Sequence, residues 1–277
     1  MYQFTIDQER CVQCGLCAQD CLAGVIEMQE YPVLNKEGCM KCEHCLTVCP
    51  TGALSIFGKN PDDSTELKGN LPTPEQMSTL IKGRRSVRHY KDEDLDAATV
   101  KKLLEVAWNA PTGVNTQGVV PTVVAAKETM DALRVEVYEE LIRFMEDGGA
   151  EKLADYGMLL NYMQAAVDGW KNDRSDLIFR GAPHLLIASS SKEMASPEAD
   201  NLIFLSYFEL LAQSMGVGTV WNGIAKFVLS VVLPHMLARL GIPEDHIVGY
   251  AMSFGRPAVK FQRTVERGPA PLNYVEL

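Results

Sequence analysis

The sequence predicts two domains: a small cysteine-rich domain, then a larger one in which helices and strands mix in an α/β or α+β arrangement. Three observations support this prediction. All eight cysteines lie within the first fifty residues. Residues 58–73 are rich in Gly, Pro, Asp and Ser and show no periodicity, which is typical of a linker. Beyond residue 74, segments with helical periodicity alternate with short apolar segments. We therefore expect a domain over 1–58, a linker over 59–73 and a second domain over 74–277.

The cysteines form two copies of one spacing, C-x2-C-x2-C-x3-C. This is the spacing of bacterial two-cluster ferredoxins, in which each [4Fe–4S] cube takes three thiolates from one run and the fourth from the other. Proline follows the second run, whereas Leu22 follows the first. The expected ligands are Cys11, Cys14, Cys17 and Cys49 for one cube, and Cys39, Cys42, Cys45 and Cys21 for the other.

Two other interpretations of the cysteines are disfavoured. Zinc also binds four cysteines, but usually through two separated C-x2-C pairs. A disulfide framework needs an oxidising compartment, and the first ten residues lack the apolar segment of a signal peptide. Short alternating segments at 2–6, 25–28 and 54–57 suit strands that flank iron–sulfur clusters. Iron–sulfur binding is the favoured interpretation.

Charge and hydropathy exclude several functions. The net charge is −10 and there is no polybasic run, so nucleic acid and anionic lipid are unsuitable partners. The longest apolar stretch, 201–212, is interrupted by Ser206 and Glu209 and is too short to span a membrane. We expect a soluble cytoplasmic protein.

The elements of the second domain can be justified in order. A helix opens at Thr73-Pro74, where a capping Thr precedes Pro at the first helical position. Apolar residues at helical spacing predict an amphipathic helix around 100–108, which ends before Pro111. Further helices are expected at 128–146, 151–170, 197–215 and 229–240, and strands at 119–126, 184–189, 218–221 and 247–254.

The helix over 201–212 is apolar on almost every face. Such a helix is buried on all sides, either in a large core or in a subunit interface. The periodicity alone leaves both possibilities open.

Two segments of the second domain carry polar groups suited to a ligand. RRSVR at 84–88 places three guanidinium groups and a hydroxyl within five residues, which suits a phosphate or a carbonyl-rich ring edge. The loop APTGVNTQ at 110–117 combines amide side chains with a glycine that permits close backbone approach. A solvated basic turn and an ordinary helix-ending turn are the alternatives. The five histidines show no metal or triad spacing.

Together these segments resemble the FMN-dependent nitroreductase family. The matching stretches are RRSVRHY (84–90), APTGVNTQ (110–117), IFRGAPHLLIAS (178–189), MGVGTVWNG (215–223) and GYAMSFGRPAVKFQR (249–263). With the cysteine runs, the whole chain resembles fusions of a ferredoxin domain with a nitroreductase. Residues 130–178 match least well. The resemblance implies an α+β fold, in which two subunits share a long central helix and hold one FMN in each of two interface pockets.

The resemblance also implies which residues bind FMN. The basic turn is expected to contact the phosphate, ribityl chain and pyrimidine edge, and the 111–115 part of the loop is expected to come from the neighbouring subunit. Gln117 is expected to lie near the ring, and the Trp221–Gly223 backbone to line the isoalloxazine near N5. Two basic residues of the C-terminal segment would complete the phosphate site, with Arg256 as a competitor. The full expected set is Arg84, Arg85, Ser86, Arg88, Pro111, Thr112, Gly113, Asn115, Gln117, Trp221, Asn222, Gly223, Lys260 and Arg263.

These features predict an oxidoreductase in which two [4Fe–4S] clusters feed FMN, which then reduces a small electron-poor acceptor such as a nitroaromatic, a quinone or an activated alkene. The flavin supplies the chemistry, so no catalytic side chain is assigned. The donor is a ferredoxin-type protein or NAD(P)H, and the expected assembly is a homodimer. One alternative is an electron-transfer protein without a small organic substrate. Another is a nicotinamide-driven enzyme whose clusters are structural.

Overall fold

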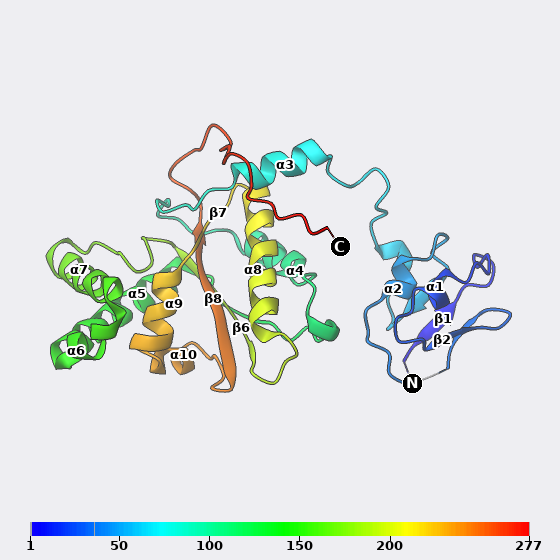
Figure 1. Ribbon diagram of the computed structural model, residues 1–277, viewed down its shortest axis with the longest axis horizontal. Helices are drawn as coiled ribbons and strands as arrows, with labels where there is room; N and C mark the ends of the chain where they lie inside the picture. Colours follow the sequence, from blue (N-terminus) through cyan, green and yellow to red (C-terminus); the bar gives the residue numbers. More distant parts are fainter. Residues whose placement is uncertain (1, 36, 277) are drawn as a thin grey trace. The chain divides into compact units, whose positions relative to one another are not determined.

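The computed structural model describes residues 2–35 and 37–276 of the chain. It divides into two compact units, Met1–Thr73 and Pro74–Leu277, which we call the N-terminal and C-terminal units (Figure 1). Each unit has its own hydrophobic core. Within the described ranges, no helix combines the length and apolar character needed to cross a membrane.

The N-terminal unit consists of two short antiparallel strand pairs and two one-turn helices. Strand β1 pairs with β4, and β2 pairs with β3. The third cysteine of each run lies in a helix, Cys17 in α1 and Cys45 in α2, and both side chains are buried in the core of the unit. Three strands lie where alternation predicts them, whereas β3 was not predicted. The elements are β1 (Phe4–Ile6), α1 (Leu16–Gln19), β2 (Ile26–Met28), β3 (Pro32–Leu34), α2 (His44–Thr47), β4 (Leu54–Ile56) and the 3-10 turn η1 (Pro61–Asp63).

The two cysteine runs adopt the same backbone conformation. Gln13 and Lys41, two residues after the first cysteine of each run, have φ angles of 53° and 55°. Gly15 and Glu43, two residues further on, have φ angles of 75° and 62°. Left-handed residues next to right-handed ones turn backbone N–H groups to one side, and such nests bind anionic groups, including iron–sulfur clusters. The sequence repeat is therefore also a repeat of local structure.

The C-terminal unit is built on a four-stranded antiparallel sheet of order β5-β6-β8-β7. The strands are β5 (Val120–Val124), β6 (His184–Ser191), β7 (Gly218–Trp221) and β8 (His246–Gly255). The helices are α3 (Pro74–Gly83), α4 (Ala97–Ala107), α5 (Lys127–Phe144), α6 (Ala150–Lys152), α7 (Met158–Asp173), α8 (Pro197–Ser214), α9 (Gly223–Phe227) and α10 (His235–Arg239). Short 3-10 or π turns are η2 (Gly113–Asn115), η3 (Met145–Gly149), η4 (Ala154–Tyr156) and η5 (Val228–Val232).

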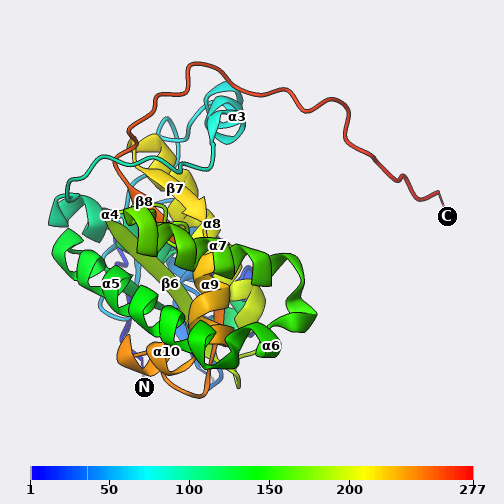
Figure 2. The ribbon, with the colours of Figure 1, turned by 90° about the vertical axis from the view of Figure 1, so that its left-hand side faces the viewer.

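Helices cover both faces of the sheet, and Figure 2 views it through α5 and α7. Successive side chains of a strand point to opposite faces. Leu185 and Ile187 of β6 accordingly join the core formed with α5 and α7. Leu186 and Ala188 join the second core, formed with α4 and α8. This two-sided burial explains why β6 reads as a continuous apolar run rather than an alternating one.

The structure differs from the expected helices at two places. The expected helix at 151–170 is interrupted, and α7 begins only after Gly157, whose φ is 48°. The expected helix at 229–240 is a π turn followed by α10, which starts after Pro234. The helix α8 lies where it is expected, and in the single chain it is buried on one side: Phe204, Leu205 and Phe208 are at most 1% exposed, whereas Leu202 and Tyr207 are 40% and 44% exposed.

Candidate functional site

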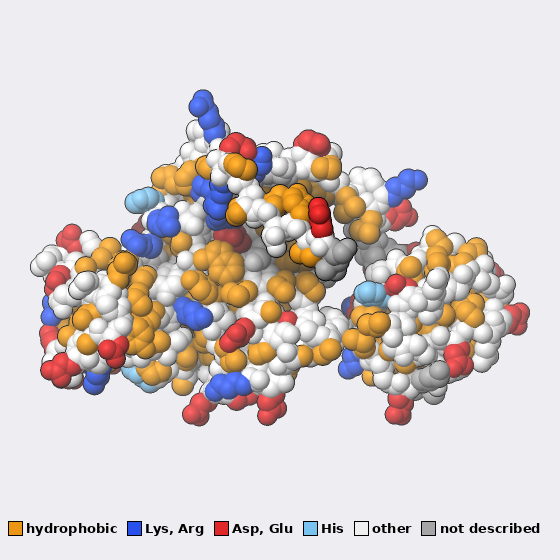
Figure 3. All heavy atoms as spheres, viewed as in Figure 1, with side chains coloured by type: hydrophobic (Ala, Val, Ile, Leu, Met, Phe, Trp, Pro, Cys, Tyr) orange, Lys and Arg blue, Asp and Glu red, His pale blue; other side chains and the backbone are white. Residues whose placement is uncertain are grey.

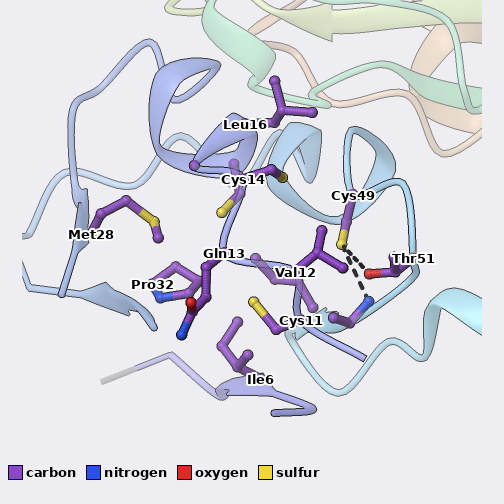
Figure 4. A pocket seen from close by; sticks show the side chains of 14 residues that line it. Ile6, Cys11, Val12, Gln13, Cys14, Leu16, Met28, Pro32, Cys49 and Thr51 are labelled. Carbon is purple, nitrogen blue, oxygen red and sulfur yellow. Dashed lines mark hydrogen bonds between the residues drawn. The ribbon is translucent and has the colours of Figure 1, made fainter. Parts of the chain in front are cut away.

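Four thiols line one pocket of the N-terminal unit: Cys11, Cys14 and Cys17 of the first run and Cys49 of the second. Figure 4 shows the sulfur atoms of Cys11, Cys14 and Cys49 turned toward a common space. Apolar side chains form much of the remaining wall, among them Ile6, Val12, Met28, Pro32 and Leu54. The pocket therefore offers soft thiolate ligands in a largely apolar setting, as an iron–sulfur cube requires.

A second pocket contains the other four thiols, Cys39, Cys42 and Cys45 with Cys21. Its wall is again largely apolar and includes Val25, Ile26, Leu34, Met40 and Ile56. Each pocket thus combines three thiols of one run with the fourth thiol of the other. The structure brings together the same two sets that the spacing predicts, and their role as cluster ligands stays a prediction.

Burial raises the pKa values of these thiols, whereas hydrogen bonds from the backbone lower them. Burial raises the pKa of Cys17, and it raises the pKa of Cys45 to about 11. Burial also opposes ionisation of Cys49, but hydrogen bonds from backbone amides, with Ala53 first, lower the pKa of that thiol. The Ala53 N–H donates to Cys49 Sγ at 3.2 Å. Buried thiolates need positive charge beside them, which the iron of a bound cluster would supply.

No group of three or more His, Cys, Asp or Glu side chains in the described ranges is arranged around a position for a metal ion. A zinc ion holds its sulfur ligands at about 2.3 Å, so four such thiols would crowd around one point. A four-iron cube is larger than one ion. Each cysteine pocket supplies four thiols, which is the donor set of a four-iron cube.

The basic turn at 84–88 lies between α3 and the sheet. Val87 N–H donates to the Thr219 carbonyl at 2.8 Å, which fixes the turn beside β7. Arg84 Nη1 lies 3.2 Å from Glu209 Oε1. Arg85 Nη2 donates to the Lys82 carbonyl. The buried Nε of Arg85 has no hydrogen-bond partner among the described residues, and a buried unpaired guanidinium nitrogen suits an acceptor-rich ligand.

The rest of the turn is more open. Arg88 is exposed, and its Nη1 lies 3.5 Å from the Ser86 carbonyl oxygen. Ser86 forms an isolated parallel bridge with Thr219. The guanidinium group of Arg88 is thus held only weakly within the chain. It can turn toward an anionic ligand at little cost in lost contacts.

A large open pocket lies next to this turn. Lys260 and Arg263 line it together with residues of α3, the Gly216–Gly218 turn and the segment 257–264. Gly83 and Val87, on either side of the first two arginines, also line it, whereas Arg84, Arg85, Ser86 and Arg88 do not. The pocket therefore combines two of the predicted basic residues with the backbone that flanks the others.

The predicted loop at 111–117 lies elsewhere, against the start of α8. Gly113 N–H donates to Oδ1 of the buried Asp200 at 2.9 Å. A Cβ at Gly113 would approach Ser196 Oγ to 2.9 Å and Ala195 Cβ to 3.2 Å, so a larger residue would force this packing to shift. Val114 has a φ of 46° and is 66% exposed. A β-branched residue in this region is strained, and such strain is concentrated at functional sites.

The predicted segment 221–223 joins β7 to α9. Asn222 is buried, and its side chain donates to the Ile178 carbonyl at 2.9 Å and to Ser253 Oγ at 2.8 Å. Its Oδ1 accepts from Ala225 N–H at 2.9 Å, which caps α9. Asn222 therefore fixes the local backbone with its side chain and leaves the Gly223 backbone at the surface of a pocket.

That pocket is mainly apolar. Its lining comprises Leu159, Gly223, Ile224, Lys226, Phe227, Ser230, Val231 and Tyr250. Lys226 Nζ donates to the Gly249 carbonyl at 2.7 Å and lies 5.3 Å from the centre of the Tyr250 ring. The hydrogen bond and the ring together hold the ammonium group of Lys226 at one side of the pocket. A small flat molecule is a suitable occupant.

Sequence reasoning missed two acidic residues of α8 that support the predicted segments. Asp200 holds the 111–117 loop through Gly113, and Glu209 pairs with Arg84. Both are buried, at 3% and 7% exposure. The available signal was an acidic residue within a long apolar helix, because buried carboxylates are rare unless they are paired.

Residues 81–256 match the model of the nitroreductase family, and residues 10–53 match that of the 4Fe-4S dicluster domain. A nitroreductase of Mycolicibacterium smegmatis is 28% identical over 198 residues, which is 64% of this chain and 80% of that protein. An uncharacterized ferredoxin of Methanocaldococcus jannaschii is 31% identical over 24% of this chain and 92% of its own length. The solved nitroreductase of Bacteroides fragilis with bound FMN has a TM-score of 0.54 at 21% identity, over 71% of this chain and 97% of that one.

The family match covers more than half of the chain, so the chain belongs to the nitroreductase family. A 4Fe-4S dicluster domain precedes the family domain. The predicted fold class is confirmed: α+β, with a ferredoxin-like unit followed by a nitroreductase fold. The dicluster match also confirms the prediction of two [4Fe–4S] clusters.

Proposed function

We propose that this protein is an iron–sulfur flavoprotein oxidoreductase, in which two [4Fe–4S] clusters pass electrons to FMN and FMN reduces a small electron-poor acceptor. The observation that carries the proposal is the presence, in one nitroreductase-family chain, of two pockets with four thiols each. FMN is bound in solved relatives from Bacteroides fragilis and Desulfitobacterium hafniense, which supports FMN as the cofactor. When bound, FMN would accept electrons singly or in pairs and so join one-electron clusters to a two-electron reduction.

The residues of the C-terminal unit would hold FMN at both ends. Lys260 and Arg263 supply positive charge in the open pocket, and Arg85 supplies an unpaired buried donor beside it. Charge-assisted hydrogen bonds of this kind suit a phosphate and the carbonyl edge of a pyrimidine. The Trp221–Gly223 backbone, fixed by Asn222, would support the ring. No side chain is required as a nucleophile or a general base.

The apolar pocket at Gly223 supports the assignment of the acceptor. It shares Gly223 with the segment proposed for the flavin ring, and Phe227 and Tyr250 supply aromatic surface. Flat electron-poor molecules such as nitroaromatics and quinones would stack on such rings. Lys226 would favour acceptors with an electronegative substituent at that side.

We propose a homodimer in which the 111–117 loop reaches the FMN site of the second subunit. Two features support this: the loop presents the exposed, strained Val114, and α8 presents Leu202 and Tyr207 on its surface. Apolar side chains gather over the region of α8 in the space-filling view (Figure 3). An exposed apolar helix face is more typical of a subunit interface than of a monomer surface.

Cys14 and Cys42 are exposed, one in each four-thiol pocket. Exposure of a ligand brings a cluster within reach of a redox partner, so a ferredoxin-type donor is the favoured electron source. The same observation favours a second candidate function. In it, the protein exchanges electrons between one- and two-electron carriers and has no organic substrate.

Anaerobic stopped-flow absorbance separates these functions. The oxidised protein is mixed first with reduced ferredoxin and, in a separate run, with NADH, and flavin bleaching is followed. The reduced protein is then mixed with a nitroaromatic or a quinone. We expect bleaching by ferredoxin and rapid reoxidation by the acceptor. Bleaching of the flavin by NADH but not by ferredoxin would contradict the cluster route. If none of the acceptors reoxidises the reduced protein, the second function would be favoured.

A further inference from the structure

Glu209 accepts hydrogen bonds from three side chains, which belong to two segments of the C-terminal unit. Its Oε1 accepts from Arg84 Nη1 and from Thr219 Oγ1, both at 3.2 Å. Its Oε2 accepts from Trp221 Nε1 at 3.0 Å. The side chain is only 9% exposed, and that of Arg84 is 23% exposed. A buried carboxylate with one cationic and two neutral donors is well compensated, whereas removal of its charge leaves the cation unpaired.

The three donors belong to the segments proposed for FMN, or lie next to them. Arg84 begins the basic turn, and Trp221 begins the 221–223 segment. Thr219 and Trp221 are two residues apart on β7, so both side chains point to the same face of the strand, toward α8. Thr219 also accepts Val87 N–H with its carbonyl at 2.8 Å. One carboxylate on α8 therefore ties both proposed flavin segments together.

We propose that Glu209 is a positioning residue for the flavin, one that orients Arg84 and Trp221 and neutralises the Arg84 guanidinium. The inference rests on the proposed FMN function. Preorganised groups bind a cofactor better when their rotamers are fixed by buried partners, and Glu209 is such a partner. The negative charge of Glu209 also lowers the electrostatic potential at the proposed flavin site. Reduction adds negative charge to FMN, so a guanidinium whose charge is not compensated favours the reduced form.

The test uses full-length Glu209→Gln, which preserves size and leaves one oxygen acceptor. The readouts are the FMN dissociation constant, from flavin fluorescence on titration into the apoprotein, and the flavin midpoint potential. We expect at least tenfold weaker FMN binding and a midpoint potential shifted to more positive values. Thr219→Val removes one neutral donor from Glu209 and should weaken FMN binding by a smaller factor, about threefold, with the carboxylate charge kept.

The matched control is Asp176→Asn. The carboxylate of Asp176 is also buried, with its side chain 7% exposed, and its Oδ2 lies 2.7 Å from Arg134 Nε. In the described part of the chain its other hydrogen bonds come from Tyr138, Phe179 and Gly181, none of which belongs to the basic turn or to β7. Its variant should lower thermal stability without a change in flavin potential. Native FMN affinity and potential in a folded Glu209→Gln protein would overturn the proposal. If that variant does not fold, native FMN affinity in Thr219→Val would overturn it. Failure of the wild-type protein to bind FMN would instead refute the proposed function.

Discussion

At the scale of single residues, the cysteine spacing predicts which thiols come together, and the structure places them in those sets. The spacing could not reveal the Ala53 N–H that bonds Cys49 Sγ at 3.2 Å, because that contact depends on how the chain turns after Pro50. Nor could it reveal that Arg84 is held by Glu209, which lies 125 residues further along the chain. Contacts between distant segments follow from tertiary packing, which a local pattern does not encode.

Paired cysteine variants test the crossed ligand sets. Cys11→Ser with Cys49→Ser damages one crossed set, so about four of about eight irons per chain should remain, as in a two-cube protein that loses one cube. Cys39→Ser with Cys49→Ser damages both crossed sets, and both clusters should be lost. Iron and acid-labile sulfide are measured after anaerobic purification. The opposite pattern, in which only the second pair preserves four irons, would show that each run binds its own cube.

Arg88→Ala tests the basic turn without disturbing the core. Arg88 is exposed, and among the residues that the structure describes its side chain makes a single long contact, 3.5 Å to the Ser86 carbonyl, so the variant should fold normally. Loss of one charge-assisted hydrogen bond costs about 1.5–3 kcal/mol, so FMN should bind roughly ten- to a hundredfold more weakly. Fluorescence titration measures this, with iron content as an internal check. Arg143→Ala, at an exposed arginine of α5, is the control, and equal FMN affinity in both variants would refute the assignment.

His184 predicts a pH dependence of stability. Burial lowers its pKa in the folded chain, and its Nε2 accepts Leu95 N–H at 3.0 Å. The unfolded chain, with a pKa near 6.5, therefore takes up the proton at higher pH than the folded chain. This contribution to the free energy of unfolding is present above about pH 6.5 and is lost as the pH falls toward the folded pKa.

The pH effect is measured by urea unfolding followed by tryptophan fluorescence, because all three tryptophans lie in the C-terminal unit. His184→Gln should reduce the fall in unfolding free energy between pH 7.5 and pH 5.5. His235→Gln is the control, since the His235 side chain is 60% exposed. If the free energy of unfolding falls by the same amount in the wild type, His184→Gln and His235→Gln, groups other than His184 determine the pH dependence.

At the scale of elements, the sequence predicts best where local signals are strong. Strand β7 has the predicted bounds, and α4 is capped by Asp96, whose Oδ1 accepts Thr99 N–H at 2.8 Å. Prediction fails where tertiary packing decides. The apolar composition of 201–212 indicates burial in a core or in a subunit interface, and the exposure of Leu202 and Tyr207 in the single chain leaves only the interface for that side of α8. Pro234 and Gly157 interrupt expected helices because each changes the backbone locally.

The faces of α8 predict different effects of added charge. Leu205 is fully buried, so Leu205→Glu should unfold the C-terminal unit. Tyr207 is 44% exposed, so Tyr207→Glu should keep the fold but separate the proposed dimer and weaken FMN binding. Sedimentation velocity with FMN absorbance measures both effects. Val135→Glu, at an exposed position of α5, is the control. A Tyr207→Glu dimer with native FMN content would place the interface elsewhere.

At the scale of the whole molecule, the chain combines two units with separate cores, and the division falls between Thr73 and Pro74. Part of the expected linker, 59–73, is ordered: Asp62 of η1 pairs with Arg10 of the N-terminal unit at 2.8 Å. The linker composition therefore predicts a separation between the units but not this local contact. A separate core in each unit indicates that the C-terminal unit can fold without the other.

The proposed electron route from the clusters to FMN is tested most directly by the rate of FMN reduction by reduced ferredoxin. This rate is measured in the full-length protein and in a chain that starts at Leu71. Both are compared with full-length Cys39→Ser with Cys49→Ser, which keeps the N-terminal segment but should lack clusters. We expect the truncated and cluster-free proteins to bind FMN and to be reduced by dithionite, but no longer to be reduced by ferredoxin. Equal ferredoxin-driven rates in all three proteins would show that electrons reach FMN without the clusters, and would contradict the proposed electron route.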